Sequence, residues 1–335
     1  MITNYILRDI ANEWDWCIQE HRLPIIETRG VNPQIPNICD EIIKYVGSHK
    51  PNMVKGSTLY YLSINITSVF CEKIDLLEID FSGNKDSEFR ANEAYLDEDS
   101  QKLTNIDILL SFSKSIKEDE FKMELSHELM HAFDCYQILI KNQGAVPQKY
   151  LKTATKYLKN NSENYDVFID NETTALLRNC MYVIYHDEIS ANIQALYTFI
   201  LNNKKITRIN YKQYIQKTAV YVSINLIKSL LRRINTANNS EKKIFGVFYM
   251  KYHQRTVNDA KEGKKTRKDK ETYWYKRFKS YLEYMLKYYE NKMYKVIYYA
   301  LEQAERLDET RIIKPLSHRL FEGNKGLLKR NIYQC

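Results

Sequence analysis

The chain has 335 residues and a formal net charge of +8, and 44% of its residues are hydrophobic. This length and composition suffice for one large domain or two modest domains with a buried core. No apolar run has the length of a membrane span, and residues 1–16 lack the apolar stretch of a secretory signal. We therefore expect no membrane partner and a protein that is made and kept in a cytoplasm or packaged from one.

The N-terminal part is predicted to be helical. Residues 3–20 carry apolar side chains at helical spacing, which indicates an amphipathic helix. Residues 22–36 contain several prolines and are predicted to be a connection, and residues 38–46 a short helix.

The pattern changes between residues 57 and 112. Three runs, at residues 58–67, 74–81 and 105–112, are rich in β-branched and aromatic residues or alternate between apolar and polar ones. Such runs are typical of strands. We expect three or four strands that form one small, mostly antiparallel sheet.

A helix is predicted next, over residues 117–141, and it contains the sequence His-Glu-Leu-Met-His at 127–131. Positions i and i+4 of a helix lie on one face, so His127 and His131 can both bind one zinc ion. Glu128 is then within reach of a water on that zinc, from which it can take a proton as the water attacks a carbonyl. Phe121, Leu125, Leu129 and Phe133 form an apolar stripe beside the histidines, which predicts that this helix is packed.

A catalytic zinc site usually has three protein ligands. The metzincin pattern is excluded, because Asp134 and Gln137 stand where it needs glycine and histidine. The favoured third ligand is Glu188, which opens a predicted helix over residues 188–201. Ala191 is small enough to let the two helices approach closely, and the Asn192 amide oxygen can accept the free N–H of a zinc-bound histidine. His186 and Asp187 are the rival third ligands.

These two motifs resemble those of the gluzincin zinc metallopeptidases, in which H-E-x-x-H is followed by a glutamate on a later helix. The sequence E-x-x-A-N at 188–192 is similar to that of the small members of this clan, some of which act on repressors in phages and mobile elements. The resemblance covers about residues 105–201. It implies one Zn²⁺ per chain, with His127, His131 and Glu188 as ligands and Glu128 as the general base.

The resemblance also implies a fold, namely a zincin-like core in which a small sheet packs on the H-E-x-x-H helix. In that plan an edge strand lines the cleft and pairs with an extended substrate. The candidate edge is residues 106–112 or the strand next to them. Family members also use a tyrosine or histidine to stabilise the oxyanion, and Tyr185, Tyr197 and His253 are the residues considered for this role.

Two further helices are predicted between His131 and Glu188, over residues 148–158 and 171–185. After residue 206 only helices are predicted. Two apolar stripes in that last part predict core or helix-pair seams. The first is Val220, Ile224, Ile227, Leu231 and Ile234, and the second is Tyr275, Phe278, Leu282, Met285 and Tyr289. The basic run between Lys261 and Lys279 is interleaved with aromatic residues, so it is either a solvated segment or a nucleic-acid contact.

The fold expected overall is α+β and dominated by helices, with a zincin-like core at residues 1–202 and a helical C-terminal region at 203–335. The function expected is that of a zinc-dependent metallopeptidase that hydrolyses peptide bonds through a zinc-activated water, with a peptide or protein as substrate. The alternative is a structural or assembly protein of a phage or mobile element, built on the same fold, whose C-terminal helices make homo- or hetero-oligomeric contacts. Such a protein would lie in a host cytoplasm or in a packaged virion.

Overall fold

The computed structural model describes most of the chain, in places by its backbone alone. The described residues are 31–54, 57–64, 73–81, 88–96, 103–113, 115–141, 170–184, 186–257 and 267–317. The helices expected at residues 3–20 and 148–158 lie outside them. Within these residues the chain is α+β and dominated by helices, as the sequence predicts.

Five strands form a single mixed sheet in the described part of the chain, in the order β1-β2-β3-β5-β4. The pairing of β3 with β5 is parallel and the other pairings are antiparallel. The strands are β1 (Asn52–Val54), β2 (Ser57–Ile64), β3 (Lys73–Phe81), β4 (Glu88–Leu96) and β5 (Leu103–Ser111).

The sheet has one strand more than the three or four expected, and the sequence located neither β1 nor β4. The residues of β4, Glu-Phe-Arg-Ala-Asn-Glu-Ala-Tyr-Leu, include no β-branched residue and several with low strand propensity. It nevertheless pairs with β5 along its length, from Glu88 opposite Ser111 to Leu96 opposite Leu103. The pairing with a neighbouring strand therefore overrides the local preference of this segment.

The same strand order identifies the edges of the sheet. Strand β5, which contains most of the candidate edge at residues 106–112, lies inside the sheet between β3 and β4. Residues 106–112 are therefore not an edge, whereas the other alternative, the strand next to them, holds for β4, which is one edge of the described sheet, with β1 at the opposite edge. Strand β4 contacts the helix that carries the two histidines, as β5 does.

The helices agree closely with the predicted ones where both exist. The helix predicted at residues 38–46 is longer, because it begins at Ile35 with Pro36 in its first turn, where a proline needs no amide hydrogen. The helices are α2 (Ile35–Ser48), α3 (Glu118–Lys141), α5 (Asn171–Val183), α6 (His186–Asn202), α7 (Tyr211–Ile215), α8 (Ala219–Asn235), α9 (Asn239–Val257) and α10 (Arg267–Ser317).

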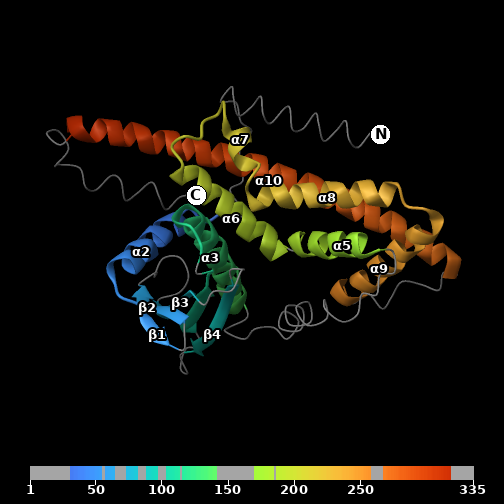
Figure 1. Ribbon diagram of the computed structural model, residues 1–335, viewed down its shortest axis with the longest axis horizontal. Helices are drawn as coiled ribbons and strands as arrows, with labels where there is room; N and C mark the ends of the chain where they lie inside the picture. Colours follow the sequence, from blue (N-terminus) through green and yellow to red (C-terminus); the bar gives the residue numbers. More distant parts are fainter. Residues whose placement is uncertain are drawn as a thin grey trace.

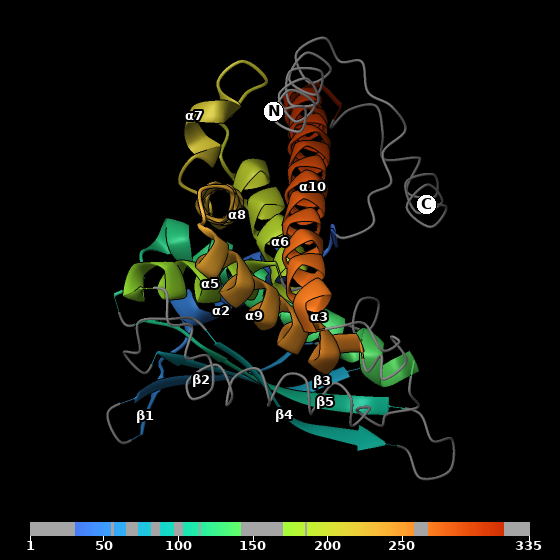
Figure 2. The same ribbon diagram turned by 90° about the vertical axis from the view of Figure 1, so that its right-hand side faces the viewer.

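The labelled helices lie on one side of the sheet (Figure 2), and α5, α8 and α9 lie to one side of it, whereas α10 runs along the length of the molecule (Figure 1). Helices α2 and α3 cover the sheet and enclose an apolar cluster that we call the sheet core. Its residues are Ile35, Ile38, Cys39, Ile42, Leu77, Ile79, Leu110, Phe112, Phe121, Leu125, Leu129, Met130, Ala132 and Ala191.

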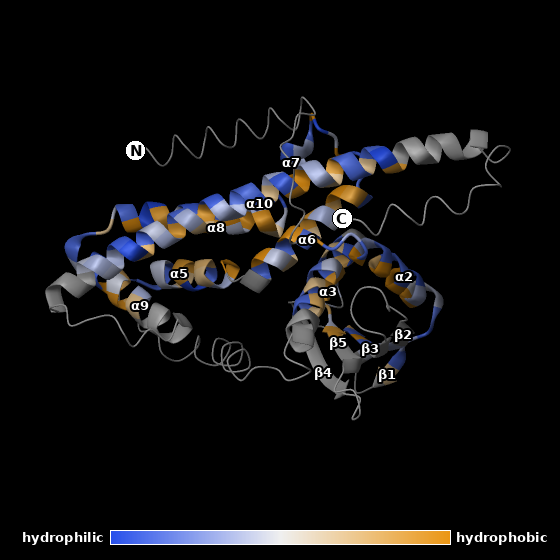
Figure 3. Ribbon diagram, turned by 180° about the vertical axis from the view of Figure 1, so that it is seen from behind, coloured by the Kyte–Doolittle hydropathy of each residue, from blue (hydrophilic) through white to orange (hydrophobic). Residues whose placement is uncertain are grey.

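A second cluster, the helical core, is made by the buried apolar side chains of helices α5 to α10, from Leu177 to Leu301. Every member of the first predicted stripe is buried there, and of the second stripe only Tyr275 is half-buried. These helices accordingly carry both hydrophobic and hydrophilic residues around their surface (Figure 3). The division at residue 202 stays a prediction.

Helix α6 joins the two clusters. Its Ala191 belongs to the sheet core, whereas its Ile189, Ile193, Leu196, Tyr197 and Ile200 belong to the helical core. None of the helices in the described segments is both long enough and apolar enough to cross a membrane.

Candidate metal centre

Helix α3 presents its two histidines side by side. Phe121, Leu125 and Leu129 are buried in the sheet core, and this stripe holds one face of the helix against the sheet. The Nε2 atoms of His127 and His131 are 3.1 Å apart, and the two rings are nearly perpendicular, at 80°. Both imidazoles therefore direct the same nitrogen to one point, as the i, i+4 spacing predicts.

Helix α6 lies against α3 and closes this point from the other side. Ala191 is fully buried in the sheet core, so only a methyl group separates the two helices there. The Ser126 and Thr198 hydroxyls form a buried hydrogen bond of 2.6 Å between the helices, one residue before His127. The close approach expected from the small residue is present.

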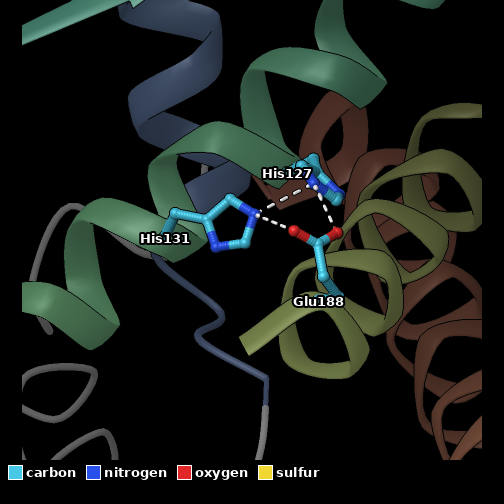
Figure 4. Close-up of side chains that lie close together, drawn as sticks. All are labelled: His127, His131 and Glu188. Atoms are coloured by element: carbon cyan, nitrogen blue, oxygen red, sulfur yellow. Dashed lines mark hydrogen bonds and ion pairs between the residues drawn. The ribbon is translucent and has the colours of Figure 1, made fainter. Parts of the chain in front are cut away.

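The Glu188 carboxylate points at the two imidazoles (Figure 4). Its Oε1 is 3.5 Å from Nε2 of His131, and its Oε2 is 3.7 Å from Nε2 of His127. These three residues form the one group of potential metal ligands found among the described residues. Residues far apart in the sequence are thus brought together in the arrangement expected for the favoured third ligand.

The spacing of the group fits zinc. Zinc–nitrogen and zinc–oxygen bonds of about 2.0–2.2 Å in a tetrahedral arrangement put neighbouring ligand atoms roughly 3.3–3.5 Å apart. The separations here run from 3.1 to 3.7 Å. Side-chain movements of a few tenths of an ångström are enough to bind the ion.

Both histidines are neutral at physiological pH. Burial, followed by the nearby His131 charge, lowers the pKa of His127 to about 3. Burial alone lowers the pKa of His131 to about 4. A neutral imidazole has a free lone pair, which is the form that binds a metal. Two neutral imidazoles and one carboxylate form the donor set.

Asn192 lies one turn after Glu188 and is buried. Its side chain hydrogen-bonds the His127 side chain and favours the protonated ring, as an acceptor does. A metal at Nε2 requires the proton of the neutral ring on Nδ1, and an amide oxygen that accepts from Nδ1–H holds that tautomer. Asn192 therefore lies close to His127, and its supporting role stays a prediction.

Glu128 is also buried, with 5% of the residue exposed, in the same turn of α3 as His127. The side chains of the rival ligands His186 and Asp187 lie outside those that the structure describes. The same is true of residue Tyr185 and of the His253 side chain.

Tyr197, the remaining residue considered for oxyanion stabilisation, lies on α6 nine residues beyond Glu188, roughly 13 Å along the axis at about 1.5 Å per residue. Its ring stacks on Tyr299 of α10, with centroids 5.5 Å apart. Burial and the neighbouring Tyr299 raise the pKa of its hydroxyl. Its side chain contributes to helix packing.

The sequence did not indicate that one further residue, Tyr289, lies in this region. Tyr289 of α10 is fully buried, and its hydroxyl lies where Asn192, Ser223 and Glu188 influence its pKa. In the sequence it is one of 27 tyrosines and continues an apolar stripe, which predicts packing. The sequence offered only a general signal for Tyr289, namely that a buried tyrosine hydroxyl usually has a polar neighbour.

A cavity of about 380 Å³ lies between α3, α6 and α10, and His127, His131 and Glu188 are not among its lining residues. Its wall includes Met130 and Asp134 of α3 and Ile189 of α6, of which Met130 and Ile189 are sequence neighbours of His131 and Glu188. Helix α10 contributes Tyr288 and Lys292 to it. This volume is in the range of small-molecule and side-chain pockets.

The chain matches no protein-family model, no curated protein and no solved structure.

Proposed function

We propose that the chain is a zinc-dependent peptide hydrolase, in which His127, His131 and Glu188 hold one Zn²⁺ per chain and Glu128 is the general base. The observation that carries the proposal is the convergence of Glu188 with the histidine pair, at separations of 3.5 and 3.7 Å. A helix with two histidines at i and i+4 arises by chance more easily than a carboxylate from a distant segment aimed at both.

The composition of the donor set favours catalysis over a structural metal. Structural zinc sites are closed by four ligands and are rich in cysteine, whereas hydrolytic sites have three protein ligands and an open position. The group here has three members, two imidazoles and a carboxylate, among the described residues. This set is the one used by zinc peptidases of the His₂Glu type.

Bound zinc supplies a Lewis acid that polarises a carbonyl and lowers the pKa of water to near neutrality. The chain's own residues supply the remaining functions. Glu128, buried beside His127, accepts the proton of the attacking water and returns it to the leaving amine. Asn192 holds the His127 tautomer that leaves Nε2 free for the ion.

The sheet offers a place for the substrate. Among the described residues strand β4 is an edge strand in contact with α3, so its outer backbone groups can pair with an extended peptide. The cavity between α3, α6 and α10, whose wall includes Met130 next to His131 in the sequence, has the volume for a substrate side chain. A zincin-like core of the gluzincin type is the arrangement that we propose for residues 31–202.

The general-base role is tested with a Glu128→Gln variant. The zinc-loaded protein is incubated with a library of unstructured peptides, and new termini are identified by mass spectrometry. We expect cleavage by the parent and a loss of roughly 10²–10⁴-fold in the variant, the usual contribution of a general acid–base residue. Elemental analysis must show that the variant retains its zinc.

Glu124→Gln is the matched control, since Glu124 lies one turn earlier on the same helix and outside the metal group. We expect it to cleave at the rate of the parent. Equal rates for the parent and Glu128→Gln, with zinc in both, would remove Glu128 from the mechanism and with it the proposed reaction.

The other partners remain predictions. Trp274 and Phe278 of the basic run are buried in the helical core, so any contact with nucleic acid would use cations such as the exposed Lys276 instead of those rings. Assembly through the C-terminal helices and a cytoplasmic or virion location also stay predictions.

A further inference from the structure

A buried polar contact lies behind the metal centre, on the side away from the sheet. Tyr289 of α10, Asn192 of α6 and Ser223 of α8 are all buried, at 0%, 5% and 2% exposure. Helix α10 packs against both α6 and α8. Three polar side chains from three helices thus meet inside an otherwise apolar core, where an unused hydrogen-bonding group costs free energy.

The Tyr289 hydroxyl is the unusual member of this group. Among the described residues no hydrogen bond of standard geometry reaches its oxygen. Burial raises its pKa, while Ser223 and Asn192 favour the ionised form, as donors to the oxygen do. Glu188 also lies close enough to raise the pKa of this hydroxyl. The hydroxyl therefore lies close to Asn192 and Glu188, on the α10 side of the candidate metal ligands.

The two ends of the Asn192 amide have different chemistry. Its oxygen can only accept, and the His127 ring is the donor that it meets. Its nitrogen can only donate, and the Tyr289 oxygen, which no hydrogen bond of standard geometry reaches, is the acceptor beside it. A bond between them would fix the amide in the orientation that places its oxygen toward His127.

We propose that Tyr289 is a positioning residue of the metal centre, which accepts a hydrogen bond from the Asn192 amide and thereby holds His127 in its metal-binding tautomer. This inference rests on the proposed metal site and extends it to a third helix. Helix α10 is then a part of the centre, and the C-terminal helical region supports metal binding directly.

The test compares zinc affinities at neutral pH, measured by competition with a chromophoric chelator. Tyr289→Phe removes only the hydroxyl, and we expect zinc binding about tenfold weaker, at the lower end of the loss seen when an outer partner of a metal ligand is removed. We also expect a changed visible absorption spectrum of the cobalt-substituted protein. Because the proposed bond from Asn192 is lost as well, the metal-free protein should also lose some heat resistance, about as much as one buried hydrogen bond contributes.

Tyr275→Phe is the control on the same helix. The Tyr275 hydroxyl donates to the Ile234 carbonyl at 3.1 Å, so this variant should lose heat resistance and keep the zinc affinity of the parent. In a second comparison, Asn192→Ala and the Asn192→Ala/Tyr289→Phe double variant should bind zinc equally, because Tyr289 acts through Asn192.

The outcomes separate the two proposals. Zinc binding by Tyr289→Phe within twofold of the parent, with an unchanged cobalt spectrum, overturns the positioning role and leaves the proposed site standing. A further loss of affinity in the double variant also overturns it. Absence of zinc binding by the parent overturns both.

Discussion

The two sides of the candidate metal centre differ in how they are built. The α3 side is local, since His127 and His131 are neighbours on one helix and their Nε2 atoms meet at 3.1 Å by helical geometry alone. The α6 side is tertiary, because Glu188 reaches the histidines only when α6 packs against α3. If the group binds a metal as we propose, its affinity depends on helix packing as well as on the ligands.

The packing that supports the α6 side comes from two clusters. Ala191 fits α6 into the sheet core, while the rest of α6 is held by the helical core and by Tyr289 of α10. A change in the helical core can thus move Glu188 and leave the histidine pair intact. We therefore expect the α3 side to respond to pH and the α6 side to respond to a larger side chain between the helices.

The largest effect is expected from pH, on the α3 side. Burial lowers the pKa of His127 to about 3 and of His131 to about 4, whereas an unfolded histidine titrates near 6.5. Between these values the unfolded chain binds more protons, so stability is fully present above about pH 6.5 and is lost as the pH falls toward 4. The two histidines together contribute a slope of up to about 2.7 kcal/mol per pH unit.

Denaturant unfolding of the metal-free protein at several pH values, with a chelator present, measures this slope. A His127→Gln/His131→Gln variant should have a much shallower slope, and His49→Gln, at the exposed end of α2, should keep the slope of the parent. An unchanged slope in the double variant would show that these two imidazoles are not held neutral by burial.

A smaller effect is expected from added bulk on the α6 side. Ala191→Leu places a large side chain between α3 and α6, and overpacking of this kind costs about 1–3 kcal/mol. The added side chain pushes α6 and its Glu188 away from the two histidines, and zinc binding has to draw them together again. Because 1.4 kcal/mol corresponds to a factor of ten in affinity, we expect zinc affinity to fall by about tenfold or more. Zinc competition and thermal unfolding measure the two consequences.

Ala300→Leu provides the comparison, since Ala300 is equally buried but lies on α10 in the helical core. It should lower stability by a similar amount and change zinc affinity less. Equal losses of affinity in both variants would mean that the spacing of α3 and α6 at Ala191 has no special part in the site.

The sequence predicted the elements whose signal is local. The apolar stripe of α3 and the pair at His127 and His131 follow from helical periodicity, and α3 is found within one residue of its predicted start. Glu188 was favoured over its rivals because a small residue, Ala191, and an amide at i+4, Asn192, follow it on the same predicted helix. The same reasoning gave the helical character of the C-terminal part.

The remaining features depend on contacts between distant segments. Strand β4 has little strand propensity and exists through its pairing with β5. Tyr289 shares its apolar stripe with packing residues, and only the arrangement of α6, α8 and α10 brings its hydroxyl to Asn192 and Ser223. Sequence periodicity shows which side chains are buried, whereas the partners of a buried hydroxyl follow from the tertiary structure.

The most direct test of the metal centre is the zinc content of the purified protein beside a Glu188→Ala variant, with Glu172→Ala, an exposed carboxylate on α5, as the control. We predict about one zinc per chain in the parent and in Glu172→Ala, and little or none in Glu188→Ala after dialysis against a weak chelator. No zinc in the parent after zinc is offered at neutral pH, or equal zinc in all three proteins, would contradict a site built from His127, His131 and Glu188.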